Sequence, residues 1–176
     1  MKSGLATAVV WVTVAGTVVA CGSLSTRDHA NTLIVVDRSI GGVELRAVRS
    51  HVDRLLGPGT VLHRFDQKPP EPPAHLEDVL YPNGLEVQYV SSSASSRGKG
   101  RAILLLTGSV SFRTRSGVGV GSTADELLLS VTGVTCGHLV SVDCSHGGGR
   151  FNEVGTFFKL TGPGGRVTKI VITYAR

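Results

Sequence analysis

Alternating apolar and polar residues predict paired strands in the middle of the chain. Leu85, Val87 and Tyr89 alternate with polar residues, which is the two-residue period of a strand with one buried and one solvated face. The apolar residues 79–81 and the turn residues 82–84 come directly before this segment. We therefore expect a hairpin over 79–90.

A second hairpin is expected near the C-terminus. There, residues 156–161 and 167–174 flank a turn rich in glycine and proline at 162–165. Four further segments have the composition of strands. They are 32–36, expected at a sheet edge, 102–106 and 110–112, expected to continue the first meander around Gly108, and 138–144.

Two segments have the 3.6-residue period of an amphipathic helix. The first lies within 46–59, where apolar residues recur at i, i+4, i+7 and i+8 from Val48 and a Gly-Pro-Gly sequence ends the helix. The second follows Thr123, which forms a capping-box pattern with Glu126, and is expected to end by Gly133. Each helix would bury one apolar face.

Three segments are expected to be loops. Residues 66–75 contain four prolines, which predicts an exposed polyproline-like connector. Residues 91–100 are rich in serine, glycine and basic side chains and indicate a flexible loop. Residues 22–31 are small and polar, as a tether would be.

The same order of signals occurs twice. Placing Gly42 over Gly117 superposes both helices and several aliphatic positions. The aligned pairs are Val43 with Val118, Leu45 with Val120, Val52 with Leu127, and Leu56 with Val131. We therefore predict an α+β fold in which two helix-plus-meander repeats, 39–115 and 116–176, pack as one domain on one continuous antiparallel sheet.

The N-terminal segment differs from the rest of the chain. An apolar run over residues 5–21 follows Lys2 and ends in Val-Val-Ala-Cys-Gly at 18–22. This run resembles the signal peptide and lipobox of bacterial lipoproteins, which place an aliphatic residue three positions before the cysteine and a small residue directly before it. The resemblance implies a signal peptide at 1–20 and a lipid anchor with its tether at 21–38.

By the same resemblance, Cys21 carries a diacylglyceryl group and palmitate and becomes the mature N-terminus on the extracytoplasmic side of a cell membrane. Acyl chains contribute about 0.8 kcal/mol per buried methylene group, so two chains anchor a protein stably. Two alternatives stay open. One is a transmembrane helix, for which the run is shorter than the roughly 20 residues needed; the other is a secreted protein cleaved nearby, with Cys21 incidental.

Charge and composition limit the kinds of binding partner to be expected. Without Lys2, 17 basic residues stand against 13 acidic ones, and the mature net charge is +4. Aromatic residues are few, with five Phe, three Tyr and one Trp, and they do not alternate with the basic residues. We expect no nucleic-acid binding. The expected partners are membrane lipid, reached through Cys21, and an envelope protein of unknown identity.

Two cysteines remain after Cys21. In an oxidising compartment, Cys136 and Cys144 are expected to form a disulfide. Each is followed by a histidine in a Cys-x-His unit, at His138 and His146, which leaves a zinc site open as an alternative. We assign no metal ligand and no cofactor, because oxidation competes for both thiols and the spacing is not a usual zinc arrangement.

Residues suited to hydrolysis are present but scattered. A serine hydrolase would have to combine Ser122 or Ser145 with His138 or His146 and with Asp143. The chain has no nucleophile elbow, and groups that are close in sequence rarely converge as a catalytic triad requires. We therefore expect no catalytic residues and no enzymatic activity.

A short motif comes before each predicted helix. It has the form Gly-aliphatic-x-aliphatic-Gly-x-Ser/Thr, and its second copy occupies Gly117, Val118, Val120, Gly121 and Thr123. The first copy matches at Gly42, Val43 and Leu45 and differs at Arg46 and Val48. This motif, followed by a helix and a meander, resembles the tandem β-lactamase-inhibitory proteins and the single-unit outer-membrane assembly lipoproteins of the SmpA/OmlA kind. The resemblance implies protein binding and transfers no binding residues.

These observations predict a lipid-anchored exported module that binds protein or supports the cell envelope without catalysis. The alternative is an inhibitor or sensor that binds one exported enzyme, and a zinc-dependent or serine hydrolase is less favoured. We expect the contact surface on the sheet, because an antiparallel meander with one covered side leaves its other side free.

Overall fold

The computed structural model describes residues 32–68, 73–137 and 143–175. Several predictions lie outside these residues: the signal peptide, Cys21 and the tether at 22–31, most of the proline run, and His138. Among the residues described, no helix has both the length and the hydropathy needed to cross a membrane.

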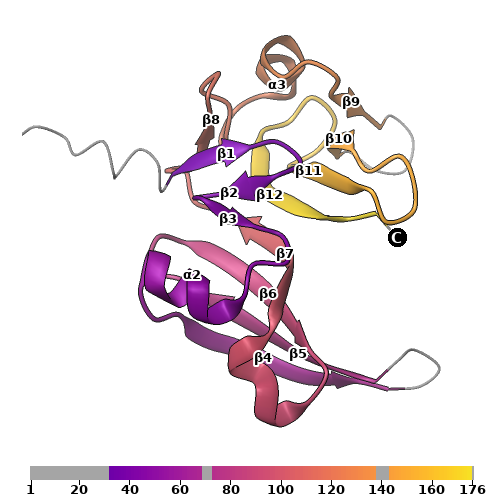
Figure 1. The fold of residues 1–176 in the computed structure, drawn as a ribbon. Coiled ribbons are helices and arrows are strands. Elements are labelled where there is room, and N and C mark those ends of the chain that lie inside the picture. The colour runs from indigo at the N-terminus through magenta and orange to yellow at the C-terminus, as the bar shows by residue number, and fades with distance from the viewer. Residues whose placement is uncertain (1–31, 69–72, 138–142, 176) are drawn as a thin grey trace, which may run out of the picture.

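An eight-stranded antiparallel sheet forms the body of the protein (Figure 1). Its strands lie in the order β4-β5-β6-β7-β12-β11-β10-β9. Their bounds are β4 Thr60–Gln67, β5 Ala74–Leu80, β6 Leu85–Ser91, β7 Arg101–Thr107, β9 Thr135–Cys136, β10 Cys144–Gly147, β11 Val154–Leu160 and β12 Val167–Tyr174. The two groups of four strands join where β7 pairs with β12, which confirms the predicted continuous sheet.

Four short strands form a second sheet in the order β3-β2-β1-β8. Their bounds are β1 Leu33–Val35, β2 Ser39–Ile40, β3 Val43–Glu44 and β8 Arg113–Thr114. Strand β1 is antiparallel to β2 and parallel to β8. The segment 32–36 contains a strand as predicted, but its expected position at a sheet edge is wrong, because β8 pairs with its second side.

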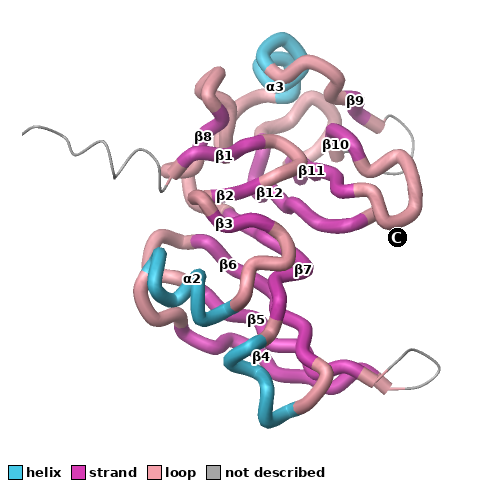
Figure 2. Tube along the Cα trace, in the orientation of Figure 1, coloured by secondary structure: helices cyan, strands magenta, loops and turns pink. Residues whose placement is uncertain are grey.

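Two α-helices and one 3-10 helix complete the described part of the fold. They are α2 Arg49–Leu56, α3 Ala124–Ser130 and the 3-10 helix η1 Ala94–Lys99. Helix α2 lies beside the strands β4–β7 and α3 beside β9–β12 (Figures 1 and 2). The fold is α+β, as predicted, and it has far more strand than helix.

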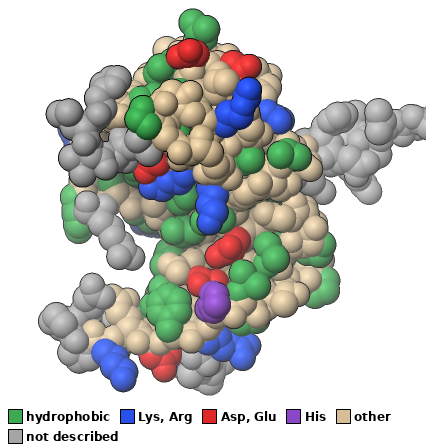
Figure 3. Space-filling model, turned by 180° about the vertical axis from the view of Figure 1, so that it is seen from behind, with side chains coloured by type: hydrophobic (Ala, Val, Ile, Leu, Met, Phe, Trp, Pro, Cys, Tyr) green, Lys and Arg blue, Asp and Glu red, His purple; other side chains and the backbone are tan. Residues whose placement is uncertain are grey.

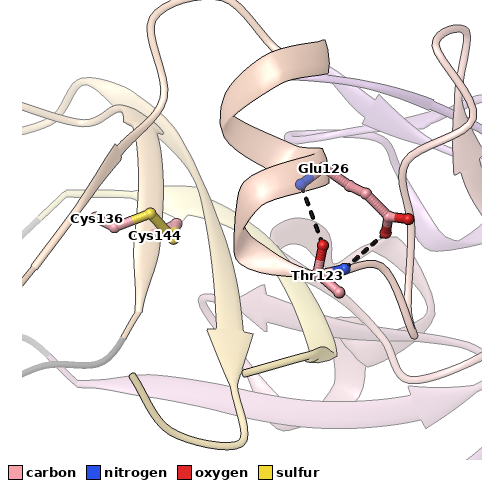
Figure 4. Close-up of a disulfide and its surroundings, with 4 residues drawn as sticks. All are labelled: Thr123, Glu126, Cys136 and Cys144. Carbon is pink, nitrogen blue, oxygen red and sulfur yellow. Dashed lines mark hydrogen bonds between the residues drawn. A yellow bond between two sulfur atoms is a disulfide. The ribbon is translucent and has the colours of Figure 1, made fainter. Parts of the chain in front are cut away.

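The helix ends follow the sequence signals. The Thr123 side chain accepts a hydrogen bond from the Glu126 backbone N–H at 3.2 Å, and the Glu126 carboxylate accepts one from the Thr123 N–H at 2.8 Å (Figure 4). This confirms the predicted capping box. Helix α2 ends before Gly57, whose φ of +85° suits glycine. Its N-cap, Val48, makes no side-chain hydrogen bond.

One face of the large sheet carries the core. Leu85, Val87 and Tyr89 of β6 are buried, whereas the residues between them are half-buried, as the alternation predicted. Val52 of α2 and Leu127 of α3 are fully buried in the same hydrophobic cluster. Both helices therefore cover this face, and we call the opposite face of the large sheet the open face.

The strand bounds correct two predictions and leave a third mostly outside the described residues. The proline connector is shorter than 66–75, because β4 continues to Gln67 and β5 begins at Ala74. Residues 110–112 do not extend the meander; they form a turn that places the Phe112 ring in the core. Of the strand expected over 138–144, residues 138–142 lie outside the described part of the chain; β10 begins at Cys144 and pairs with the short β9.

Candidate functional site

The predicted disulfide joins Cys136 of β9 to Cys144 of β10 (Figure 4). These residues lie directly opposite each other in the antiparallel pair, with their Cα atoms 4.0 Å apart. The next pair along, Gly137 with Asp143, shares a backbone hydrogen bond of 3.1 Å. The cysteines thus occupy a non-hydrogen-bonded pair, where side chains approach most closely. The disulfide prediction is confirmed.

The zinc alternative loses its sulfur ligands, because a disulfide has no thiolate to offer a metal. His146 has a different partner: its Nδ1 lies 2.5 Å from Oδ2 of Asp37. The Thr156 hydroxyl donates to the other Asp37 oxygen at 2.8 Å and accepts from the Asp37 N–H at 2.6 Å. No metal-binding group of His, Cys, Asp and Glu is found among the described residues.

Three of the residues considered for hydrolysis contact other groups in the structure. Ser122 is buried next to the N-terminus of α3, where its hydroxyl accepts from the Gly119 N–H at 3.2 Å. Ser145 lies on β10 opposite Phe157, and Asp143 forms an ion pair with Lys159. His146 is held by Asp37. The described residues therefore do not assemble the considered triad.

A polar cluster fastens α2 to the core face of the sheet. The Glu77 carboxylate on β5 is almost fully buried and binds two guanidinium groups, Arg49 of α2 and Arg64 of β4. Tyr81 donates to Asp53 of α2 at 2.9 Å. Every charge here has an opposite partner, as burial requires, so this cluster is structural.

Burial also perturbs two phenols in this region. The hydroxyl oxygens of Tyr81 and Tyr89 lie 2.7 Å apart inside the core. Burial raises the pKa of Tyr89 to about 12. Burial also raises the pKa of Tyr81, with further contributions from its contacts with Tyr89 and Asp53. Both phenols are therefore neutral over the physiological pH range.

The open face has an apolar centre. Directly opposite residues of an antiparallel pair share a face, so the register traces rows across the sheet. One row runs from Glu86 of β6 through Leu106, Val171 and Phe157 to Ser145 of β10. Three aliphatic or aromatic side chains thus lie side by side, with polar residues at both ends.

A hollow of about 910 Å³ lies over this face, and we call it the sheet hollow. Its lining residues come from the five strands β4, β6, β7, β11 and β12, from the turn after β10 and from Ala175. Those that matter here are Gln88, Leu104, Phe151, Phe157, Val171 and Thr173. Figure 3 shows the side of the molecule away from α2, with the surface hollowed between its upper and lower parts and apolar side chains among charged ones.

The rim of the sheet hollow is polar and internally paired. Lys159 at the rim is bound to Asp143. Tyr174 accepts a hydrogen bond from Arg46 Nε at 2.9 Å, and the guanidinium lies 5.6 Å from the ring centre. Phe151 also lines the hollow but is apolar, and 77% of its surface is exposed. An exposed aromatic residue beside an apolar floor is typical of a surface that contacts another molecule.

A glycine sets the position of one aromatic ring in the sheet hollow. Gly148 has a φ of +66°, and a Cβ atom there would lie 3.3 Å from both Phe157 Cζ and Gly155 Cα. Only glycine allows this turn to pack so closely against the ring. Gly148 and Gly149 thus begin the connection between β10 and β11.

Sequence reasoning did not single out the residues of the sheet hollow. Phe157 and Val171 pair within the β11–β12 hairpin, whereas Leu104 belongs to the first meander, so its proximity to them depends on the pairing of β7 with β12. One signal was present: Val171 lies out of phase with Ile170 and Ile172, which are fully buried on the core face. The phase of that strand identified one floor residue but not its neighbours.

Comparison with known proteins returned no match: no family model, no curated protein and no solved structure matches this chain. The class that the fold defines is an α+β domain with one continuous antiparallel sheet whose helices cover a single face.

Proposed function

We propose that this protein is an exported, lipid-anchored module that binds another protein through the sheet hollow and has no catalytic role. The observation that carries this proposal is the apolar floor of the hollow, formed by Leu104, Val171 and Phe157 inside a polar rim. Specific protein interfaces have this arrangement of an apolar centre within a polar border.

The shape of the sheet hollow also favours a protein partner. It is wide and open, and its polar groups Lys159 and Tyr174 are satisfied by neighbours within the chain. An enzyme site would instead have several polar groups converging on one point in an enclosed pocket. The floor suits an apolar side chain presented by a partner's loop or helix.

We also infer that the two halves of the chain are tandem repeats of one unit. The support comes from backbone hydrogen bonds at equivalent positions before each helix. The matched pairs are Arg46 N to Ala102 O with Gly121 N to Val167 O, Ala102 N to Ala47 O with Val167 N to Ser122 O, and Arg49 N to Gly100 O with Ala124 N to Gly165 O. Each set ties the start of a helix to the start of the strand that joins the two halves of the large sheet, β7 or β12.

Backbone conformation supports the same inference. Gly42 and Gly117 have φ values of +78° and +86°. Arg46, which departs from the expected glycine, has a φ of +67°, and its counterpart Gly121 has a φ of +92°. A left-handed conformation is unfavourable for arginine, so the fold retains at this position the geometry that the motif encodes.

The anchored state rests on the lipobox resemblance. The first described residue, Thr32, lies eleven residues after Cys21. A chain of that length spans at most about 40 Å. The sheet hollow would then lie within reach of proteins in or near the same membrane.

The binding proposal is tested by photo-crosslinking from defined positions of the full chain in the cells that make it. A photoreactive amino acid replaces Gln88 or Thr173 in the hollow, and Leu129 serves as the matched control, because it is 88% exposed on α3. We expect protein adducts from the two hollow positions only, and their loss when Phe151→Glu is added. Equal adducts from Leu129, or none from the hollow, would overturn the proposal.

The anchor is tested by the intact mass of protein extracted from membranes, before and after reduction and alkylation. We expect a mature chain that begins at a lipid-bearing Cys21, with two thiols alkylated only after reduction. An unmodified mass with the leader retained would contradict the lipoprotein assignment. The identity of the crosslinked partner then separates an envelope scaffold from an inhibitor of an exported enzyme.

A further inference from the structure

The two ends of the large sheet differ sharply. At one end β9 has only two residues and is joined to β10 by the disulfide. At the other end β4 has eight residues and pairs on one side only, with β5, among the described strands. A long edge strand offers a row of backbone N–H and C=O groups to another strand.

The side chains of β4 do not protect this edge. Six of its eight residues are exposed, including Leu62 at 40% and Phe65 at 46%. The strand contains no proline, the residue that most directly prevents added pairing. Its charges are of both signs: Arg64, which also binds Glu77, and Asp66, which also contacts His75, have side chains that are 56% and 54% exposed.

The positions of these charges select one pairing register. In a two-fold antiparallel pair of identical strands, residues directly opposite each other share a face, so the axis passes through a single residue. An axis at Arg64 or at Asp66 sets like charges against each other. An axis at Phe65 sets Arg64 of each copy against Asp66 of the other and the two aromatic rings against each other, and both kinds of pair are favourable.

We propose that β4 is a self-association edge, where two copies of this chain pair antiparallel about an axis at Phe65 and join their large sheets. The paired segment runs from Leu62, opposite Lys68 of the other copy, to Lys68, opposite Leu62 of the other copy. This segment lies between the irregularity after Val61 and the proline run. Phe65 pairs with Leu76 of β5, so it lies on the open face. The apolar surface of the open face therefore continues across the axis.

The register is tested by cysteine crosslinking in the full chain carrying Cys21→Ser. Phe65→Cys places identical thiols directly opposite each other, where a disulfide forms readily. Gln67→Cys is the matched control, because Gln67 lies opposite His63 and about 13 Å from its own copy. We expect the Phe65→Cys dimer to form at least tenfold faster than the Gln67→Cys dimer.

A mixing experiment checks the same register independently. His63→Cys and Gln67→Cys proteins should crosslink when mixed, and neither should do so efficiently alone. Equal rates for Phe65→Cys and Gln67→Cys, or no crosslinking in the mixture, would overturn the register.

Association itself is measured on the unsubstituted Cys21→Ser chain by light scattering and sedimentation. We expect a concentration-dependent dimer that Phe65→Arg weakens at least tenfold, because it sets two cations on the axis. Leu129→Arg, at a residue of α3 that is 88% exposed and outside the large sheet, should leave the dimer intact. A monomer at all concentrations would overturn the proposal, and circular dichroism verifies that both variants are folded. Gln67 of β4 also lines the sheet hollow, but dimerisation and partner crosslinking are separate measurements, so each proposal can fail alone.

Discussion

At the scale of single residues, Thr156 links the two sheets. Its hydroxyl is fully buried and bonds both the N–H and the carboxylate of Asp37, which in turn holds His146. Thr156→Val keeps the shape of the side chain but removes both bonds and leaves a polar group unsatisfied. We expect the free energy of unfolding to fall by about 1–3 kcal/mol. Urea unfolding measures this loss.

Thr168→Val is the control for this change. The Thr168 hydroxyl also bonds a backbone carbonyl, that of Lys159, but at an exposed position. Its loss should change stability by no more than about 0.5 kcal/mol. Equal losses in the free energy of unfolding would show that the hydrogen bonds to Asp37 contribute no more to stability than the exposed hydrogen bond of Thr168.

The buried phenols predict a loss of stability at alkaline pH. Below pH 10, tyrosines are protonated in both the folded and the unfolded chain. Above it, the unfolded phenols ionise while burial keeps Tyr89, with a pKa of about 12, and Tyr81 protonated in the folded state. The folded state then binds more protons, so the free energy of unfolding falls as pH rises, by about 1.4 kcal/mol per pH unit for each tyrosine.

The measurement compares urea unfolding between pH 9 and pH 12 for the unsubstituted chain and for Tyr81→Phe/Tyr89→Phe. The double variant should show a flatter dependence, because other groups titrate equally in both proteins. Parallel curves would mean that the two phenols ionise normally in the folded state.

At the scale of elements, the two helices differ in their N-caps. Thr123 completes a capping box, whereas Val48 at the equivalent place has no cap, although both residues have extended backbone. Thr123→Ala should lower the free energy of unfolding by about 1 kcal/mol. Val48→Thr should raise it by roughly 0.5 kcal/mol. Thermal and urea unfolding of both variants test this opposition, and effects of the same sign would contradict it.

Elements were predictable where local pattern and burial agree. The β5–β6 and β11–β12 hairpins, the capping box and the end of α2 follow from alternation, helical spacing and turn residues. Strand β4 was missed because its side chains are mostly exposed. Its sequence therefore lacks the alternation of buried apolar and exposed polar residues that marks a strand. Strands β8 and β9 have two residues each, and only their partners make them strands.

At the scale of the whole molecule, the disulfide reinforces one end of the large sheet. Replacing Cys136 and Cys144 by serine should lower the free energy of unfolding by roughly 2–3 kcal/mol, the value expected for a short loop. The rest of the sheet should persist, because β10 still pairs with β11. Hydrogen exchange should increase in β9 and remain unchanged in β12. Unchanged stability would contradict this role.

The sequence alone determined the α+β class, the hairpins, the capped helix and the cysteine pair, because each depends on residues close together in the chain. Tertiary structure decided the rest. The sheet hollow exists because β7 pairs with β12, which brings Leu104 and Phe157 together from distant hairpins. The link from Asp37 to Thr156 spans 119 positions, and no local pattern encodes it. Long-range contacts are selected by the packing of the whole core, so they become visible only when the chain is folded.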